Sequence, residues 1–382
     1  LSSSETISQL IAGDEVSFAL TSTGKFYTWY RVCSESEKPT KLEYFDEILS
    51  SSEIITQIVA GNYNSFALTN KGILYSWGWN KFGQCGLGNI TLNFNNPMRI
   101  FFFDDCLSNG EVIINIDSGH QHALALSNRG NLYSWGENRE GQCGLSKNLD
   151  NMLIPAKIEI NALLDDDEEI VQLAPGRNHN LVLTSKGSVL SWGSNEKCQC
   201  GVGKTKENIF KPVKLNQFWQ DDESIVQLAA GRVHSMALMS NGTVYTWGSN
   251  DYGECGFLKK KLIVNPTCMT SFDKNETITS ISAGDFYSVA LTNTGIVYCW
   301  GKNGGGQCGL GDSLEKIKMP TAPDFKNLLH NDERIIQICA GDDHCLALSD
   351  KGAVCVWGEN HLQQCGKGPH EIYHPILIPE FV

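Results

Sequence analysis

The chain has 382 residues and a formal net charge of −13, with 30 Lys and Arg against 43 Asp and Glu. This acidic balance argues against a duplex-binding surface, which needs clustered Lys and Arg. The sequence has no run of 18 apolar residues and no signal-peptide pattern, so we predict neither a membrane-spanning helix nor a secretory leader.

The first predicted element is a degenerate copy of a unit that recurs along the chain. It runs from Glu5 to Trp29; Trp29-Tyr30 stands where later copies have Trp-Gly, and no Gly-Gln-Cys-Gly follows. The first residue is Leu rather than Met, and we expect this segment to be one domain of a longer protein.

The second copy, Ala60 to Gly88, shows the unit in full. Segments 54–60, 65–69 and 73–77 are short and rich in β-branched, aromatic or small residues, which is typical of strands. Residues 69–72 end in Gly72 and carry the turn chemistry of a hairpin. A possible fourth strand lies in the connection at 96–100. Each unit therefore predicts a small antiparallel sheet.

Two glycines and a tryptophan keep a fixed spacing in seven copies. The second glycine follows the first by eleven residues, and the tryptophan follows five residues later. The first glycines are Gly13, Gly61, Gly119, Gly176, Gly231, Gly284 and Gly341. The tryptophans are Trp29, Trp77, Trp135, Trp192, Trp247, Trp300 and Trp357. Fixed spacing inside the unit, with variable gaps between units, indicates a repeat architecture.

The connections between later copies hold charged and glycine-rich runs. We interpret the acidic runs at 161–169 and 221–223 as solvated turns, and Lys259-Lys260-Lys261 as a solvated loop rather than a nucleic-acid contact. The glycine run 304–306 is no phosphate loop, because the Lys-Ser/Thr of that motif is missing. The tail, 374–381, matches the connection strand of earlier copies.

Small sheets of this kind cannot bury two apolar faces alone and must stack on copies of themselves. Radial stacking gives a β-propeller, whose blades are four-stranded sheets. We therefore predict an all-β propeller that uses residues 1–382 as one domain. We further predict that the tail strand pairs with the N-terminal segment, closing the ring and removing two exposed edges.

The 14 cysteines do not form a disulfide framework in this interpretation. Six occupy the same place in successive copies, which separates them by a blade each. They are Cys85, Cys143, Cys200, Cys255, Cys308 and Cys365. We expect them to be small buried hydrophobes, and the compartment to be reducing, cytoplasmic or nuclear. The repeated tryptophans are expected in the core, whereas the off-repeat Trp79 and Trp219 are candidate interface anchors.

Nothing in the pattern supports covalent catalysis. No Ser-His-Asp, His-Glu-x-x-His or paired-carboxylate constellation is present. Histidine recurs three places after the first glycine, at His122, His179, His234 and His344, but each belongs to a different blade. We interpret them as loop histidines that bond neighbouring backbone, and predict no metal and no cofactor.

The recurring pattern, with its AG, ALT, WG and GQ segments in register, resembles the regulator of chromosome condensation 1 (RCC1) repeat, with Cys mostly replacing Leu of GQLG. The match covers nearly the whole chain. The resemblance implies a seven-bladed propeller, and the best-known activity it implies is guanine-nucleotide exchange on the small GTPase Ran. Such an exchange factor binds the nucleotide-free GTPase better than the loaded one.

The resemblance also implies a partner-binding set in the loops after the first glycines. Its members are Asp14, Asn62, His120, Gln121, His122, Arg177, Asn178, His179, Arg232, His234, Asp285, Asp342, Asp343 and His344. Two departures weaken this assignment. The loops of copies three and four, 119–122 and 176–179, hold no acid, and the connection 146–155 shows no inserted wedge.

Three functions follow from these observations. The first is a protein-binding propeller, binding or regulating a small GTPase and acting as a Ran-type exchange factor. The alternative is a non-catalytic recognition domain of a larger signalling or ubiquitin-ligase protein. A photoreceptor like the plant ultraviolet sensor of this fold would need clustered extra tryptophans, and only Trp79 and Trp219 are available. The sequence does not identify the partner, the working face or the oligomeric state.

Overall fold

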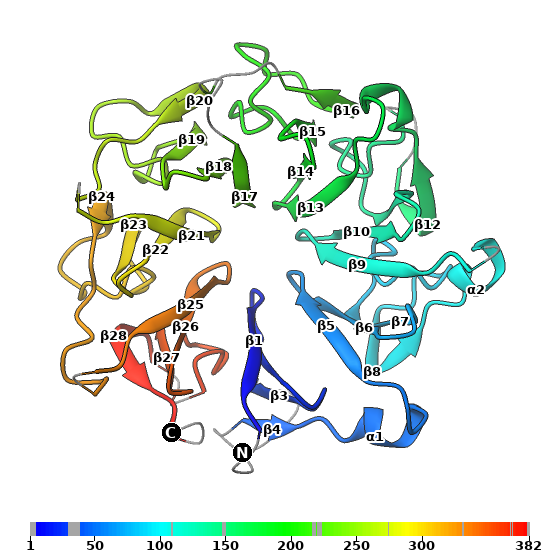
Figure 1. Ribbon diagram of the computed structural model, residues 1–382, viewed down its shortest axis with the longest axis horizontal. Coiled ribbons are helices and arrows are strands. Elements are labelled where there is room, and N and C mark those ends of the chain that lie inside the picture. The colour runs from blue at the N-terminus through cyan, green and yellow to red at the C-terminus, as the bar shows by residue number, and fades with distance from the viewer. Residues whose placement is uncertain are drawn as a thin grey trace. The chain divides into compact units, whose positions relative to one another are not determined.

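A computed structural model describes residues 5–29, 39–107, 110–146, 150–215, 219, 224–273, 275–330, 332–366, 368 and 370–379. The fold class is all-β, a seven-bladed β-propeller: the described strands form seven four-stranded antiparallel sheets, each made from one contiguous stretch of chain (Figure 1). Two α-helices of five residues, α1 (Tyr44–Ile48) and α2 (Phe102–Cys106), and the 3-10 helix η1 (Asn161–Leu163) lie in connections. No helix within these ranges is long and apolar enough to cross a bilayer.

The sheets, called blades 1 to 7, each take four consecutive strands. Blade 1 holds β1 (Ile7–Ala12), β2 (Ser17–Thr21), β3 (Phe26–Trp29) and β4 (Thr40–Lys41). Blade 2 holds β5 (Ile55–Ala60), β6 (Asn64–Thr69), β7 (Leu74–Trp79) and β8 (Asn93–Arg99). Blade 3 holds β9 (Ile113–Ser118), β10 (His122–Ser127), β11 (Leu132–Gly136) and β12 (Met152–Ile158). Blade 4 holds β13 (Ile170–Pro175), β14 (His179–Thr184), β15 (Val189–Gly193) and β16 (Ile209–Lys214).

The remaining three blades follow the same order. Blade 5 holds β17 (Ile225–Ala230), β18 (His234–Met239), β19 (Val244–Ser249) and β20 (Leu262–Cys268). Blade 6 holds β21 (Ile278–Ala283), β22 (Tyr287–Thr292), β23 (Val297–Lys302) and β24 (Lys316–Thr321). Blade 7 holds β25 (Ile335–Ala340), β26 (His344–Ser349), β27 (Val354–Gly358) and β28 (Ile372–Leu377). The strands predicted from the repeat, including the fourth in the connection, are confirmed.

The chain divides into two compact units. Unit 1 comprises Leu1–Lys41, Lys197–Gly203 and Phe218–Val382, and so contains blades 1, 5, 6 and 7. Unit 2 comprises Leu42–Glu196 and Lys204–Gln217, and contains blades 2, 3 and 4.

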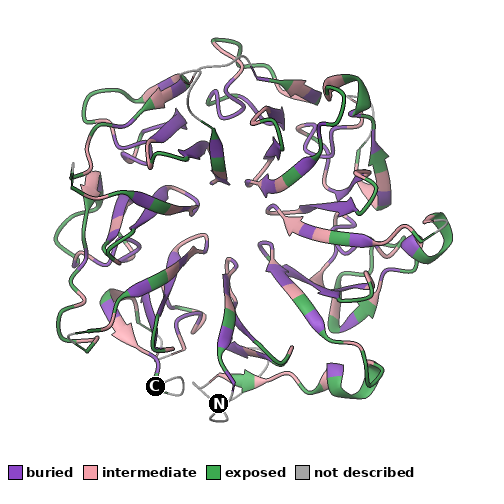
Figure 2. Ribbon diagram, in the orientation of Figure 1, coloured by how far each residue is buried: buried purple, intermediate pink, exposed green. Residues whose placement is uncertain are grey.

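The hydrophobic core lies between neighbouring blades, as the repeat predicts. The second strand of every blade is buried along its whole length (Figure 2). Six of the seven repeat tryptophans are fully buried, and Trp77 is half-buried beside Phe45. The six repeat cysteines are also buried. Burial raises the pKa of the Cys85 thiol to about 12, so it behaves as a small hydrophobe.

The predicted pairing of the tail with the N-terminal segment is wrong. β28 pairs with β27 inside blade 7, and blade 1 supplies its own fourth strand, β4. A tail strand that follows β27 directly has a local antiparallel partner, so pairing across the whole chain is not needed. Blades 7 and 1 meet instead through side chains and loops, and β1 contacts β25 and β26 within unit 1.

Each blade begins with a glutamate that the sequence interpretation missed. Six described glutamates lie eight residues before the first glycines: Glu5, Glu53, Glu111, Glu168, Glu276 and Glu333. Most accept a hydrogen bond from the hairpin that joins the second and third strands. Examples are Thr21 Oγ1 to Glu5 Oε1 at 2.8 Å and Asn131 Nδ2 to Glu111 Oε1 at 2.7 Å.

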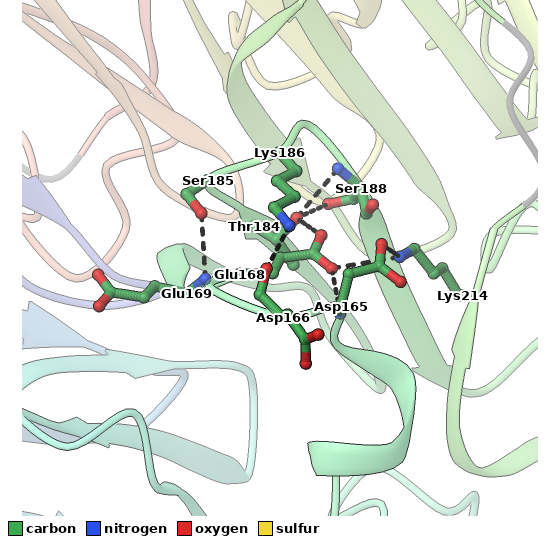
Figure 3. Close-up of polar contacts among 9 residues, drawn as sticks. All are labelled: Asp165, Asp166, Glu168, Glu169, Thr184, Ser185, Lys186, Ser188 and Lys214. Atoms are coloured by element: carbon green, nitrogen blue, oxygen red, sulfur yellow. Dashed lines mark hydrogen bonds and ion pairs between the residues drawn. The ribbon is translucent and has the colours of Figure 1, made fainter.

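Figure 3 shows this arrangement in blade 4, where Glu168 lies in the acidic run. Its carboxylate accepts hydrogen bonds from the Asp165 backbone N–H at 2.8 Å, from the Thr184 hydroxyl, and from Lys214 Nζ at 3.2 Å. Burial opposes its ionisation, but these hydrogen bonds and one with Ser188 outweigh it and lower the pKa to about 2. The prediction of a solvated turn therefore holds for the exposed residues 165–167 but is wrong for Glu168.

Candidate protein-interaction face

The loops after the first strand of each blade, here called the first-turn loops, are tight turns that touch one another. In each, the first glycine N–H donates to the carbonyl three residues later, as in Gly341 to His344 at 2.8 Å. A Cβ on Gly341 would lie 2.3 Å from the carbonyl oxygen of Gly13 in the next loop. The invariant glycine is therefore required by the close approach of neighbouring loops.

Backbone hydrogen bonds join these loops in series within each unit. In unit 1, Arg232 N–H donates to Asp285 O at 3.1 Å, Asp285 N–H to Asp342 O at 3.0 Å, and Asp342 N–H to Gly13 O at 3.3 Å. In unit 2, Asn62 N–H donates to His120 O and His120 N–H to Arg177 O. In six of the seven loops the residue after the first glycine is thus fixed through its backbone, so these side chains occupy defined positions.

The four recurring histidines lie inside the molecule, not on a binding surface. His122, His179, His234 and His344 are fully buried. His122 Nε2 lies 2.7 Å from Asn180 Oδ1 and His234 Nε2 lies 2.8 Å from Ser288 Oγ, each partner belonging to the next blade. Burial lowers the pKa of His122 to about 4 and that of His234 to about 3.

His122, His234 and His344, the last bonded to Ser17 of blade 1, therefore link blades as neutral rings at neutral pH. The assignment of all four histidines to partner contact is corrected, because a fully buried side chain cannot touch a partner. The sequence predicts bonds from these histidines to neighbouring backbone, but His122, His234 and His344 bond side chains of the next blade instead. Asn62 is also buried, at 4% exposure, which leaves little of its side chain for contact.

Acidic side chains of the first-turn loops gather in unit 1. Asp14 lies near Glu15, Asp285, Asp343 and Glu359. Burial, followed by repulsion from these carboxylates, raises the pKa of Asp14 to about 7. Asp342 follows Gly341 in the same series of loops. Asp285 is buried, at 8% exposure, and the other carboxylates of this set are half-buried. We call this set, Asp14, Glu15, Asp285, Asp342, Asp343 and Glu359, the acidic loop surface.

Two cations adjoin the acidic loop surface. Arg232 Nη1 lies 2.9 Å from Asp285 Oδ2, and Lys302 Nζ lies 2.9 Å from Asp343 Oδ1. Asp343 also accepts a hydrogen bond from Gln307 Nε2 at 2.7 Å. Six carboxylates against two cations leave the surface acidic. Glu15, Glu359 and Lys302 were missed in the sequence; Glu359 and Lys302 share one repeat position, two places after the tryptophan.

The equivalent loops of unit 2 hold no acid. His120, Gln121, Arg177 and Asn178 are half-buried there, and Asn178 Nδ2 donates to Glu140 Oε1 at 3.3 Å. The predicted binding set therefore divides into an acidic part in unit 1 and a neutral to basic part in unit 2. Within the described ranges, no group of three or more His, Cys, Asp or Glu is arranged to hold a metal ion.

Comparisons with known proteins agree with the repeat and the propeller fold. The family model described as the regulator of chromosome condensation (RCC1) repeat matches residues 71–126, 129–183, 186–238, 241–291 and 294–348. The ultraviolet-B receptor UVR8 of Arabidopsis thaliana is 31% identical over 76% of this chain and 62% of its own length. The probable E3 ubiquitin-protein ligase HERC6 of Homo sapiens is 30% identical over 69% of this chain and 25% of its own length.

The chain thus spans less than two thirds of these relatives. Among solved structures, Prp20p from Saccharomyces cerevisiae, studied for its binding to Gsp1p and histones, superposes with a TM-score of 0.76. It is 22% identical, and the match covers 98% of this chain and 87% of Prp20p. At this identity the likeness concerns the fold.

Proposed function

Because this chain belongs to the regulator of chromosome condensation (RCC1) repeat family, we propose that it is a protein-binding propeller whose partner is a small GTPase of the Ran class, on which it promotes nucleotide exchange. The acidic loop surface supports this proposal most directly. It unites Asp14, Asp285, Asp342 and Asp343 from three different blades. Prp20p, whose fold is shared, is described with its binding to Gsp1p and histones.

The mechanism needs no covalent chemistry. A preformed acidic surface attracts a partner with a basic face and raises the rate of encounter. Exchange follows if the propeller binds the nucleotide-free GTPase more tightly than the loaded form, since a ligand shifts an equilibrium only by its differential affinity. The loop-to-loop hydrogen bonds hold the surface rigid, which reduces the entropy lost on binding.

The test is the release rate of fluorescent GDP from a Ran-class GTPase with the domain added. We expect acceleration by the wild type, and a loss of about tenfold or more in the Asp342→Asn/Asp343→Asn double variant, with a weaker effect at high salt. Glu169→Gln removes an exposed carboxylate outside the surface and serves as the matched control. No acceleration for any member of the class tested would remove exchange from the proposal.

A second function is a non-catalytic recognition domain within a longer protein. Its support is that the chain covers only 25% of the ligase HERC6. The same variants separate the two functions. If the domain only recognises a partner, the GTPase or another basic protein should bind the wild type more tightly than the double variant, as titration calorimetry would measure. GDP release should then stay at its spontaneous rate.

A further inference from the structure

Exposed apolar side chains are unevenly distributed over the repeats. Of the fifteen large hydrophobic side chains that are exposed in the described residues, seven belong to residues 42–107, the blade 2 repeat with its connections. Several others occupy one repeating position, the second residue of the first strand, as in Ile114, Val171 and Val226. The blade 2 repeat and its connections therefore hold nearly half of the exposed large apolar side chains in the described residues.

Three aromatic rings on these loops form one cluster. The rings of Tyr63 and Trp79 lie edge to face, 5.7 Å apart at 79°, and those of Trp79 and Phe82 lie 5.4 Å apart at 86°. A backbone hydrogen bond of 2.7 Å from Trp79 N–H to Tyr63 O fixes the first pair. Tyr63 is 42% exposed, and Trp79 and Phe82 are partly exposed. The rings are thus rigid and reach solvent.

Two cations border this cluster. Lys81 Nζ lies 5.9 Å and Arg139 Cζ 5.7 Å from the centre of the Phe82 ring. The Arg139 side chain is 69% exposed. Glu137 Oε1 lies 3.9 Å from Arg139 Nε, and burial raises the pKa of Glu137. We call Tyr63, Trp79, Phe82, Lys81 and Arg139 the blade 2 aromatic surface.

The other repeats show that the fold does not require this aromatic character. Trp79 lies two places after the repeat tryptophan. The same place holds Glu137, Ser194, Ser249, Lys302 and Glu359 in blades 3 to 7. Blades with polar residues at this position form the same four-stranded sheet. An exposed tryptophan here is therefore not explained by packing within the repeat.

A similar aromatic pair in unit 1 is covered by cations instead. Tyr252 and Phe286 lie 5.0 Å apart, with Lys316 Nζ 4.4 Å from the Tyr252 ring and Arg232 Cζ 5.0 Å from the Phe286 ring. Arg232 is further held by Asp285. In the blade 2 aromatic surface, both cations lie over one ring, that of Phe82, and Tyr63 is 42% exposed.

We propose that the blade 2 aromatic surface is a second docking site, for a short acidic segment of a partner protein that carries an apolar anchor side chain. Trp, Tyr and Arg are the residues that dominate binding energy at interfaces. Lys81 and Arg139 attract an acidic peptide to this surface, whereas the chain as a whole, with a net charge of −13, repels one. Three rings and two cations form a surface suited to a peptide segment rather than a standard interface of about 800 Å² per partner.

The test is selection from a phage-displayed library of random dodecapeptides on the immobilised domain, followed by fluorescence anisotropy of the selected peptides. We expect enriched sequences that combine Asp or Glu with an aromatic or large aliphatic residue. Changing the acids to Lys, or the anchor to Ala, should weaken binding by about tenfold or more.

The protein variants take residues from other repeats, so that the fold is preserved. Trp79→Ser introduces the serine that blades 4 and 5 have at this position. Lys81→Glu/Arg139→Glu introduces at both positions the residue type of Glu196, which occupies the equivalent place in blade 4. Both should weaken binding about tenfold or more, whereas Leu258→Ser, an exposed residue of blade 5, should not. If Trp79→Ser does not fold, the charge-reversal variant carries the test.

Three results would overturn the proposal: enrichment of basic peptides, no enrichment at all, or affinities for the acidic peptides within twofold of wild type in the charge-reversal variant. The GDP-release assay is independent of this surface. The Asp342→Asn/Asp343→Asn variant should bind the peptides like the wild type, so failure of either proposal leaves the other testable.

Discussion

At the scale of single residues, the most informative group is the glutamate that precedes each first strand. Such a carboxylate, as Glu168 shows, ties the start of the sheet to the hairpin between the second and third strands. Burial of the charged Glu168 carboxylate costs free energy, but hydrogen bonds to its ionised form outweigh this desolvation cost. Glu168, although it lies in an acidic run of the sequence, therefore stabilises the blade through its hydrogen bonds.

Glu168→Gln should lower the free energy of unfolding by about 1–3 kcal/mol at pH 7, because hydrogen bonds to a charged acceptor are lost. The folded-state pKa is depressed to about 2, so this contribution is complete above the ordinary pKa of glutamate and is lost as pH falls toward 2. Urea unfolding at pH 7 and pH 3 would measure it, with Glu169→Gln as control. An equal difference at both pH values would contradict this account.

At the scale of elements, five of the repeat tryptophans bond a loop of the preceding repeat: Trp135, Trp192, Trp247, Trp300 and Trp357. Each indole N–H donates to a backbone carbonyl in the preceding blade's loop, as in Trp247 to Gln199 O at 2.8 Å and Trp300 to Glu254 O at 2.9 Å within unit 1. A glutamine of the first strand adds a second link: Gln227 bonds both the N–H and the carbonyl of Ile281. Packing and polar contacts therefore occur together at the junction of blades 5 and 6.

Trp300→Phe should destabilise the protein by about 1–3 kcal/mol, because the Glu254 carbonyl loses one of its two hydrogen-bond donors, keeping only Ser288 Oγ, and volume is lost from a fully buried site. Chemical denaturation monitored by circular dichroism would measure this effect. Trp219→Phe is the matched control, since Trp219 is half-buried and lies off the repeat position. Similar midpoints for the two variants would show that the indole hydrogen bond contributes little.

At the scale of the whole molecule, the first and last blades meet without sharing a sheet. Ser17 in blade 1 donates to Gln364 O at 2.7 Å and lies 2.8 Å from His344 Nε2 in blade 7. Residues of both blades, including Leu10, Trp29, Leu346 and Val356, form one hydrophobic cluster in unit 1. Blades 1 and 7 are therefore held together by side-chain packing, a backbone hydrogen bond between loops and one buried hydroxyl.

Ser17→Ala should cost about 1–3 kcal/mol, because it leaves both the His344 ring and the Gln364 carbonyl without their partner in a buried site. Hydrogen exchange should become faster in β1, β25 and β26 together, since these strands contact one another. Ser8→Ala, which removes a bond within blade 1, is the control. Faster exchange confined to blade 1 would contradict the proposed role of this contact.

The sequence predicted the strands, their order within the unit, and the buried tryptophans and cysteines, because these follow from local periodicity and fixed spacing. It also located the acids of copies one, six and seven. It assigned the four histidines to the surface, although Ser288 beside His234 shows that their partners lie one blade away. Residue type alone does not reveal whether a loop position faces solvent or a neighbouring sheet.

By itself, then, the sequence determined the repeated unit and its class of fold, since each sheet is encoded by contiguous residues. Only the tertiary structure decided where the tail pairs, which acids share a surface, and that Trp79 joins an exposed cluster. Those outcomes depend on stacking between blades, which brings together groups as distant as Ser17 and His344, 327 residues apart along the chain. No local pattern carries that information.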